Sequence, residues 1–335
     1  MFEIEIIMNR TVIYKTFILI ACVGCTGNLP ENNEAEASLR LSSLSIHEES
    51  QSKAATGTVT SISDVCVYVA KDDNTAYDAL VPSLFFTNKS GNWASDKSVL
   101  MVEGQSANVY GAFPADATIT NDNGNLKVNV EVLKGGDNTL DFLGSQQYDY
   151  LYSDKTAATY QNRTISLVMK HALAKVSFRI TKAADVSENL LLTQVKILSN
   201  TNLLQTGSGY MLLSGTQSSA ADGGTLNGLA STSQITLDNS SGTKLQTSQS
   251  SPNVTCMVAP MNTTESVLSF SLTVQEEGST DNRTFVTSSI SPAVQWKAGF
   301  HYVYQITINK MSGDVDGVLI EDWQDDASQN TSIGI

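Results

Sequence analysis

Histidine and cysteine, which often carry out catalysis or bind metals, are scarce in this chain of 335 residues, with three histidines and four cysteines. Its three histidines, His47, His171 and His301, have no second histidine at a spacing that suits a metal ion. The sequence also lacks the glycine-rich phosphate loop, the dinucleotide fingerprint and the GxSxG nucleophile motif. With no constellation of nucleophile, base or metal ligands, the sequence predicts a protein that is not an enzyme and that needs no metal and no cofactor.

Two weaker chemical signals have simpler interpretations. Asp314 and Asp316 in DVDG resemble the start of a calcium loop, but the third carboxylate and the terminal glutamate are missing, so we interpret both as turn residues. Trp93, Trp296 and Trp323 could form a platform on which sugar rings stack, whereas large aromatic side chains in a β protein more often fill the core. The platform defines an alternative function, that of a surface glycan-binding lipoprotein in a polysaccharide-uptake system.

Residues 1–25 predict an export signal. Two basic residues precede a short apolar run, and two cysteines, Cys22 and Cys25, follow small residues at its end. This arrangement resembles the lipobox of bacterial lipoproteins, in which the cysteine is acylated and becomes the first residue of the mature chain. Either cysteine fits as the lipidation site, because Cys22 has the better upstream residues and Cys25 the more usual signal length. Residues 26–38 are acidic and poor in apolar side chains, which is typical of a flexible tether.

Composition narrows the class of protein further. Only 16% of the residues are charged, the net charge is −14, and the sequence has no cluster of Lys and Arg. Phosphate contacts need such clusters, so we expect no binding to nucleic acid. The two remaining cysteines, Cys66 and Cys256, lie far apart in the sequence. A bridge between them stays open, but two small buried side chains are the simpler interpretation.

Beyond the tether, apolar and polar residues alternate in segment after segment, which predicts β-strands with one buried and one exposed face. The segments are 64–70, 127–133, 163–169, 175–181, 267–275 and 301–309. Helical windows are scarce, so the predicted fold class is all-β, built from antiparallel β-sandwiches. A polar stretch near residue 160 predicts a boundary between an N-terminal domain, 39–160, and a C-terminal domain, 161–335, in which 199–251 forms long polar loops.

Several stretches, in a consistent order, resemble the fimbrillin family of Bacteroidales, the lipoprotein subunits of type V pili. They are KSVLMVEGQSANVYGAFPA (97–115), YDYLYSDK (148–155), NRTISLVMKHALAKVSFRI (162–180), VQWKAGFHYVYQITINK (294–310) and VDGVLIEDW (315–323). The resemblance implies two tandem, transthyretin-like Greek-key sandwiches. It also implies a structural or adhesive subunit of a cell-surface fimbria, anchored in the outer membrane through an N-terminal lipid. Its partners would be other fimbrial subunits of the family and a receptor on a host or bacterial surface.

The resemblance implies assembly by donor-strand exchange, in which proteolysis removes the first strand and a strand of the next subunit fills the groove. LRLSSLSIH (39–47) would be the displaced strand, with a phase break at Ser42–Ser43. Its apolar residues are Leu39, Leu41, Leu44 and Ile46. Cleavage after Lys53 would detach the whole strand, whereas cleavage after Arg40 would leave most of it attached. Family subunits are typically cut after arginine in this loop, so Lys53 is a departure.

The donor strand is expected at the C-terminus. Its candidate residues are Val318 and Ile320, followed by Ile333 and Ile335 in TSIGI. The position of the subunit in the shaft, tip or anchor of a fimbria is left open by the sequence.

Overall fold

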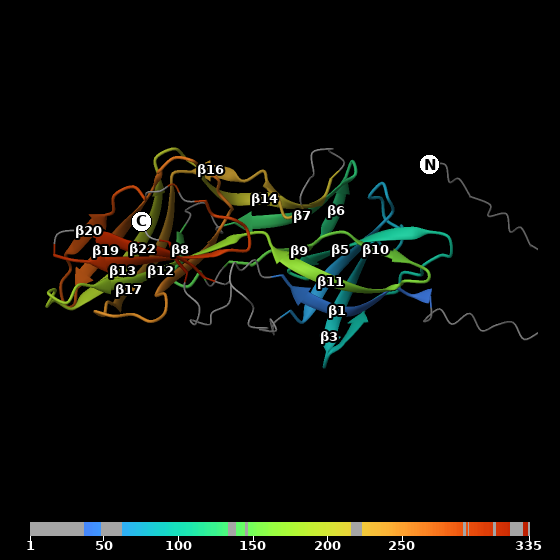
Figure 1. The fold of residues 1–335 in the computed structure, drawn as a ribbon, viewed down its shortest axis with the longest axis horizontal. Coiled ribbons are helices and arrows are strands. Elements are labelled where there is room, and N and C mark those ends of the chain that lie inside the picture. Colours follow the sequence, from blue (N-terminus) through green and yellow to red (C-terminus); the bar gives the residue numbers. More distant parts are fainter. Residues whose placement is uncertain are drawn as a thin grey trace, which may run out of the picture. The chain divides into compact units, whose positions relative to one another are not determined.

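Every regular element that the structure describes is a β-strand (Figure 1). The computed structural model describes residues 37–47, 62–132, 139–144, 147–215, 223–290, 293, 295–310, 313–321 and 331–333, the last two ranges as backbone alone. The strands in chain order are β1 (Arg40–Ile46), β2 (Asp64–Ala70), β3 (Ser83–Lys89), β4 (Asn92–Ser95), β5 (Ser106–Phe113), β6 (Ile119–Asp122), β7 (Asn125–Val132), β8 (Thr139–Asp141), β9 (Leu151–Ser153), β10 (Thr156–Thr159), β11 (Thr164–His171), β12 (Ala174–Lys182), β13 (Leu190–Ser199), β14 (Leu204–Ser214), β15 (Leu226–Asn227), β16 (Ala230–Thr232), β17 (Gln234–Lys244), β18 (Val254–Val258), β19 (Leu268–Glu276), β20 (Asn282–Val286), β21 (His301–Ile308), β22 (Gly313–Glu321) and β23 (Thr331–Ile333). The all-β prediction is therefore confirmed for these residues, and within them no helix is long and apolar enough to cross a membrane.

The strands form four sheets. One has eight strands in the order β1-β11-β9-β5-β2-β3-β4, with β10 paired to β5. Its two end strands, β1 and β4, contact each other, so this sheet curves almost into a barrel. The other three sheets follow the orders β18-β12-β21-β22-β23, β20-β19-β13-β17-β8 and β15-β14-β7-β6, with β16 paired to β14.

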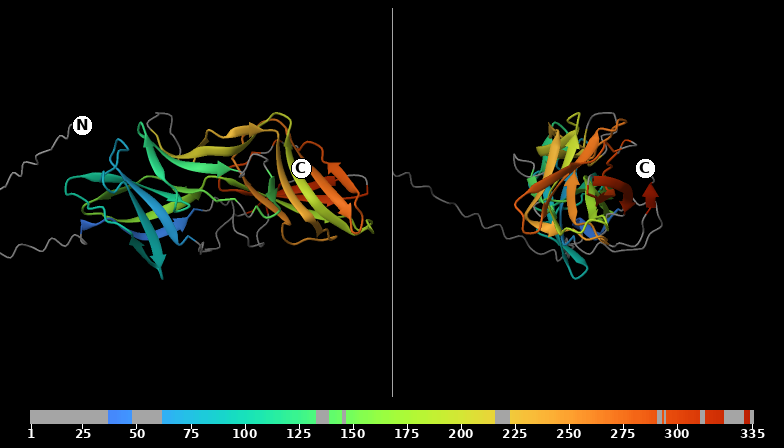
Figure 2. Two further views of the ribbon diagram at one scale, coloured as in Figure 1. Left: turned by 180° about the vertical axis from the view of Figure 1, so that it is seen from behind. Right: turned by 90° about the vertical axis from the view of Figure 1, so that its left-hand side faces the viewer.

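Most of the ladders are antiparallel, as predicted, but three are parallel: β1 with β11, β12 with β21, and β8 with β17. Figure 1 shows β1 beside β11, and Figure 2 shows the same pair from behind, in blue and yellow-green. Parallel neighbours cannot be joined by a tight turn and need a long connection. These three pairings therefore join segments that lie far apart in the sequence.

Two clusters of buried side chains form the core. The smaller cluster lies within the curved eight-stranded sheet and contains Val65, Val67 and Val69 of β2. The larger cluster includes side chains from the other three sheets, and it also includes Cys66 and Tyr68 from the opposite face of β2. Strand β2 is thus buried on both faces, which corrects the prediction of one buried and one exposed face. The reason is that β7 and β14 contribute to the same cluster as the second face of β2.

Two strands cross the predicted division of the chain. Strand β11 follows residue 160 but pairs with β1, and β7 precedes residue 160 but pairs with β14. The boundary near residue 160 stays a prediction. The segment 199–251, where the sequence predicts long polar loops, contains strands β14 and β17, each of eleven residues.

Candidate strand-exchange site

Strand β1 pairs with β11 over most of its length. It runs parallel to β11 from Arg40, opposite Thr164, to Ile46, opposite Met169. At its two ends, the Arg40 N–H donates to the Arg163 carbonyl at 2.8 Å and the His47 N–H donates to the Met169 carbonyl at 2.6 Å. Sheet ladders satisfy backbone groups that burial would otherwise leave unpaired. Removal of β1 would therefore expose one edge of β11.

Four apolar side chains of this segment enter the smaller core cluster. Leu39 and Leu41 are 2% and 4% exposed, and Leu44 and Ile46 are half-buried against the same cluster. These are the four residues that the sequence assigned to the displaced strand. Their burial decreases along β1 in the chain direction, so the first half of the segment makes the larger contribution to the core.

The phase break expected in the middle of this segment is a β-bulge. The register with β11 shifts between Leu41 and Ser43, which leaves Ser42 without an opposite residue. The Ser42 hydroxyl donates to the carbonyl of Ile165 at 2.8 Å, and its Oγ lies 3.0 Å from Oγ of Ser166. A second donor, the Ser43 hydroxyl, reaches Ser166 Oγ at 2.8 Å. Serine hydroxyls thus bond to β11 at the position where the ladder is interrupted.

Gly111 of β5 gives the core below β11 its shape. A Cβ atom at this position would lie 3.0 Å from the sulfur of Met169 and 3.1 Å from a methyl group of Leu167. The Gly111 N–H donates to the Ser153 hydroxyl at 2.7 Å. The absence of a side chain at residue 111 therefore lets Leu167 and Met169 of β11 pack directly on β5.

The candidate donor residues lie partly within the described strands. Val318 and Ile320 belong to β22, which pairs with β21, and Ile333 belongs to β23. Val318 is opposite Ile333 in the ladder between β22 and β23. Ile335 lies outside the described residues, as do Cys22, Cys25 and Lys53.

Residues that suggested chemistry have other roles in the structure. His171 Nδ1 lies 2.8 Å from the carboxylate of Asp149, and His301 Nε2 lies 2.8 Å from the hydroxyl of Ser177. Both histidines are buried. In the described part of the chain, no three His, Cys, Asp or Glu side chains form a group that could hold a metal ion. Cys66 and Cys256 are buried free thiols, as the simpler interpretation predicted.

The structure corrects the turn predicted at DVDG and limits the tryptophan platform predicted for sugar binding. The aspartates of DVDG are not in a turn, because Asp314 pairs with Thr307 in the ladder between β21 and β22. The Trp296 side chain is only 1% exposed, so it cannot form a surface platform for sugars. Trp93 is half-buried against the smaller core cluster, and Trp323 lies outside the described residues.

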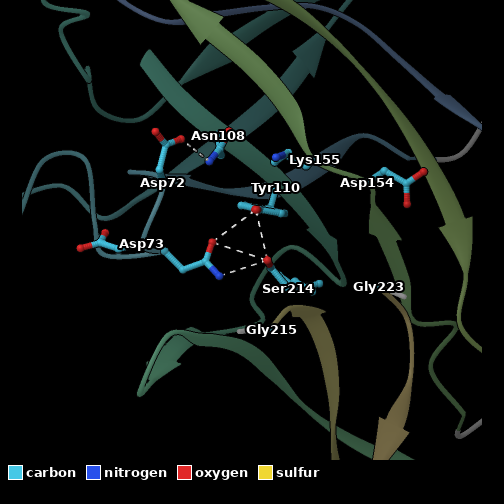
Figure 3. A pocket seen from close by; sticks show the side chains of 11 residues that line it. Asp72, Asp73, Asn108, Tyr110, Asp154, Lys155, Ser214, Gly215 and Gly223 are labelled. Atoms are coloured by element: carbon cyan, nitrogen blue, oxygen red, sulfur yellow. Dashed lines mark hydrogen bonds between the residues drawn. The ribbon is translucent and has the colours of Figure 1, made fainter. Parts of the chain in front are cut away.

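Sequence reasoning missed a polar cavity of about 430 Å³ (Figure 3). Its lining includes Asp72, Asn74, Asn108, Tyr110 and Ser214. These residues come from the segment after β2, from β5 and from the end of β14. No local spacing in the sequence links them, so only the pairing of the sheets brings them together.

The comparison with known families decides what kind of protein carries this fold. The sequence model of the family described as Fimbrillin-like matches residues 52–323. The chain belongs to the fimbrillin-like family. The match spans strands of all four sheets, and it confirms the family suggested by the ordered sequence stretches.

Solved structures share the fold of this fimbrillin-like chain. A candidate cell adhesion protein from Bacteroides uniformis matches with a TM-score of 0.57 and 18% identity, over 86% of this chain and 99% of that chain. A fimbrial protein from Bacteroides vulgatus matches with a TM-score of 0.50 and 13% identity, over 86% of this chain and 100% of that chain. At these identities the likeness shows a common fold alone. No curated protein matches the sequence.

Proposed function

We propose that this fimbrillin-like chain is a structural or adhesive subunit of a cell-surface fimbria, and that it polymerises by exchanging β1 for a strand of the next subunit. The observation that carries the proposal is β1 itself. It is an end strand of its sheet, and its segment places Leu39 and Leu41 in the core. In this proposal the four sheets make up two tandem, transthyretin-like sandwiches, the first of which contains the exchanged strand.

The free energy gained by filling the groove of β1 is large enough to hold two subunits together. Fully burying a leucine side chain contributes about 1.5–3 kcal/mol, so Leu39 and Leu41 together contribute about 3–6 kcal/mol. Folded proteins are stable by only about 5–15 kcal/mol in total. A chain that lost β1 would lose a large part of its stability and would expose the edge of β11. A strand from a second copy could restore both the apolar contacts and the backbone hydrogen bonds.

Before cleavage, the same interactions keep the subunit closed. Strand β1 is part of the same chain as its groove, so it competes with any external strand at a high effective concentration. Cleavage between β1 and β2 removes this advantage. The uncut chain is therefore expected to stay monomeric, and the cut chain is expected to polymerise.

The cleavage site in this proposal is Lys53. The peptide bond after Arg40 lies within β1, where the Arg40 N–H and the following residues are paired with β11. Proteases cut exposed loops more readily than hydrogen-bonded strands. Cleavage after Lys53 would also leave all of β1 on the released peptide, whereas cleavage after Arg40 would not. This assignment requires a protease that accepts lysine.

The remaining parts of the proposal concern the donor and the anchor. In this proposal the donor is the C-terminal segment with Val318, Ile320, Ile333 and Ile335, which would leave its pairing with β21 to join the next subunit. A lipid on Cys22 or Cys25 would hold the unassembled subunit at the outer membrane. Metabolic labelling with a palmitate analogue in Cys22→Ser and Cys25→Ser variants identifies the lipidated residue, because only one of the two changes should abolish the label.

Limited trypsin treatment of the full chain tests the assembly. The expected result is a cut after Lys53 followed by a ladder of oligomers on a denaturing gel run without heating. The Lys53→Gln variant should stay monomeric under the same treatment. An Ile333→Ser variant should be cut but should form shorter ladders, whereas the neighbouring Ser332→Ala change should have no effect. Cut protein that remains monomeric at high concentration would refute strand exchange.

A further inference from the structure

A polar cavity lies beside the eight-stranded sheet, and its lining includes no residue of β1 or β11. It has a volume of about 430 Å³ and lies between the segment after β2, strand β5, residues 154–155 between β9 and β10, and the end of β14 (Figure 3). Binding sites for small molecules commonly have volumes of about 300–1,000 Å³. The cavity is therefore large enough for a ligand of one or two rings.

The floor of the cavity is a hydrogen-bonded set of side chains, of which Tyr110 and Asn74 are buried and Ser214 is half-buried. The Tyr110 hydroxyl lies 3.3 Å from Oδ1 of Asn74 and 3.2 Å from Oγ of Ser214. The amide of Asn74 donates to Ser214 Oγ at 3.1 Å and to the carbonyl of Gly124 at 2.8 Å. Tyr110 and Asn74 are only 3% and 7% exposed. These bonds hold the floor in one arrangement before any ligand arrives, which lowers the entropy cost of binding.

The side chains above the floor offer hydrogen-bond acceptors that are already oriented. Asn108 is 8% exposed, and its Nδ2 donates to Asp72 Oδ1 at 3.2 Å. This bond uses the donor side of the Asn108 amide, and its carbonyl oxygen makes no hydrogen bond with any described residue. Asp73 is held by Thr75 through its backbone N–H and its hydroxyl. Each of these groups keeps at least one oxygen for a ligand.

Two charged residues complete the rim. Asp154 is paired with Lys170 at 2.7 Å. Lys155 is exposed and has no ion pair or hydrogen bond with the described residues, so its ammonium group is an available donor. The rim thus combines three carboxylates, those of Asp72, Asp73 and Asp154, with one free ammonium group.

This set of groups discriminates between classes of ligand. The three carboxylates disfavour an anion. A metal ion is disfavoured as well, since each carboxylate already accepts a hydrogen bond or ion pair and no metal-holding group of three exists among the described residues. A sugar hydroxyl both donates and accepts hydrogen bonds, so it can use the carboxylate oxygens and the ammonium group at the same time. We propose that this cavity binds a neutral sugar residue of a glycan.

The inference goes beyond the proposed assembly and does not depend on it. None of the cavity residues belongs to β1, β11 or the C-terminal segment. Sugar binding can therefore be measured with the uncut, monomeric chain. Failure of strand exchange would leave the sugar site untouched, and failure of sugar binding would leave the exchange proposal untouched.

The test is a titration of the full chain with the methyl glycosides of glucose, galactose, mannose, fucose and N-acetylglucosamine, followed by NMR. N-acetylneuraminic acid serves as the anionic comparison. At least one neutral glycoside should bind with a dissociation constant of about 10 mM or lower, a strength typical of a few hydrogen bonds. Loss of one such bond in Lys155→Ala should weaken binding about 5- to 10-fold.

Variants make the outcome specific to the cavity. Asn108→Ala should weaken binding at least as much as Lys155→Ala, and the exposed Lys97→Ala should leave it unchanged. Lys155 makes no contact that folding needs, so its variant stays informative even where Asn108→Ala lowers stability. Absence of binding by every neutral glycoside would overturn the proposal. Tighter binding of N-acetylneuraminic acid, or unchanged binding in Lys155→Ala, would overturn it as well.

Discussion

Replacing Leu41 by alanine tests whether β1 is an energetic part of the core. Leu41 is 4% exposed and lies opposite Ile165 of β11. The change removes three carbon atoms from a packed site, each worth about 0.8 kcal/mol in transfer energy, or about 2.4 kcal/mol together. The cavity that remains adds to this loss, and measured costs for buried leucines run from about 2 to 5 kcal/mol. We expect a loss of about 3 kcal/mol.

Urea unfolding followed by tryptophan fluorescence measures this loss. Trp93 packs against the smaller core cluster, and Trp296 lies within the larger one, so variants that retain only Trp93 or only Trp296, with Trp323 replaced in both, report on each core separately. With a denaturant slope of about 2–3 kcal/mol per molar, the midpoint reported by Trp93 should fall by about 1 M or more. The midpoint reported by Trp296 should fall less, because Leu41 belongs to the other cluster.

A neighbouring residue provides the control. Ser45 lies in the same strand, is exposed and faces Val168 across the ladder. Ser45→Ala should change the stability by no more than about 0.5 kcal/mol, as is usual for surface positions. A loss below about 1 kcal/mol in Leu41→Ala, or an equal loss in both variants, would refute the assignment of β1 to the core and would remove the energetic basis of strand exchange.

Three further predictions concern the larger core. Burial raises the pKa of the Cys256 thiol from 9.0 to about 12. As the pH rises, the unfolded chain therefore loses the thiol proton before the folded chain does, and the free energy of unfolding should fall between about pH 9 and pH 12. Urea midpoints should therefore decline less steeply in Cys256→Ala, and an unchanged slope would contradict the prediction. The Trp296 indole N–H donates to the Tyr304 hydroxyl at 2.9 Å, and both side chains are buried. Tyr304→Phe should therefore lower the free energy of unfolding by about 1–3 kcal/mol. An unchanged melting temperature would count against a stabilising role of this bond. The Gln147 side-chain amide donates to the Met257 carbonyl at 2.6 Å and accepts from the Met257 N–H at 2.7 Å. Gln147→Leu should therefore accelerate hydrogen exchange of the Met257 amide. An unchanged exchange rate would disprove this prediction.

The bond pattern of Gln147 shows how the edge of a sheet is closed without a strand. Its side-chain amide makes the pair of hydrogen bonds to Met257 that the backbone of a neighbouring strand would make. Two residues before Met257, the N–H of Thr255 donates to the carbonyl of Phe142 at 2.7 Å. Unprotected edges tend to pair with other chains. Phe142 and Gln147 therefore cover part of the edge strand β18 within the subunit, whereas polymerisation is proposed to use the groove of β1.

The positions of many strands follow from the amino-acid sequence alone. In β7 and β11 the buried residues alternate as the period of two predicts, because successive side chains of a strand point to opposite faces whatever its partner is. The segment 39–47 was identified in the same way, and its phase break became the bulge at Ser42. The order of short stretches also identified the family that the match over residues 52–323 confirmed.

Which strands are neighbours and which of their faces are covered depends on how the whole chain folds. The pairing of β1 with β11 uses backbone groups that are the same in every residue, so no local pattern specifies it. Burial of the second face of β2 depends on another sheet packing over it. The polar cavity requires Asn74, Tyr110 and Ser214 to meet from three separate strands or loops. Alternation is a local property of the chain, whereas neighbours, covered faces and cavities are properties of the assembled sheets.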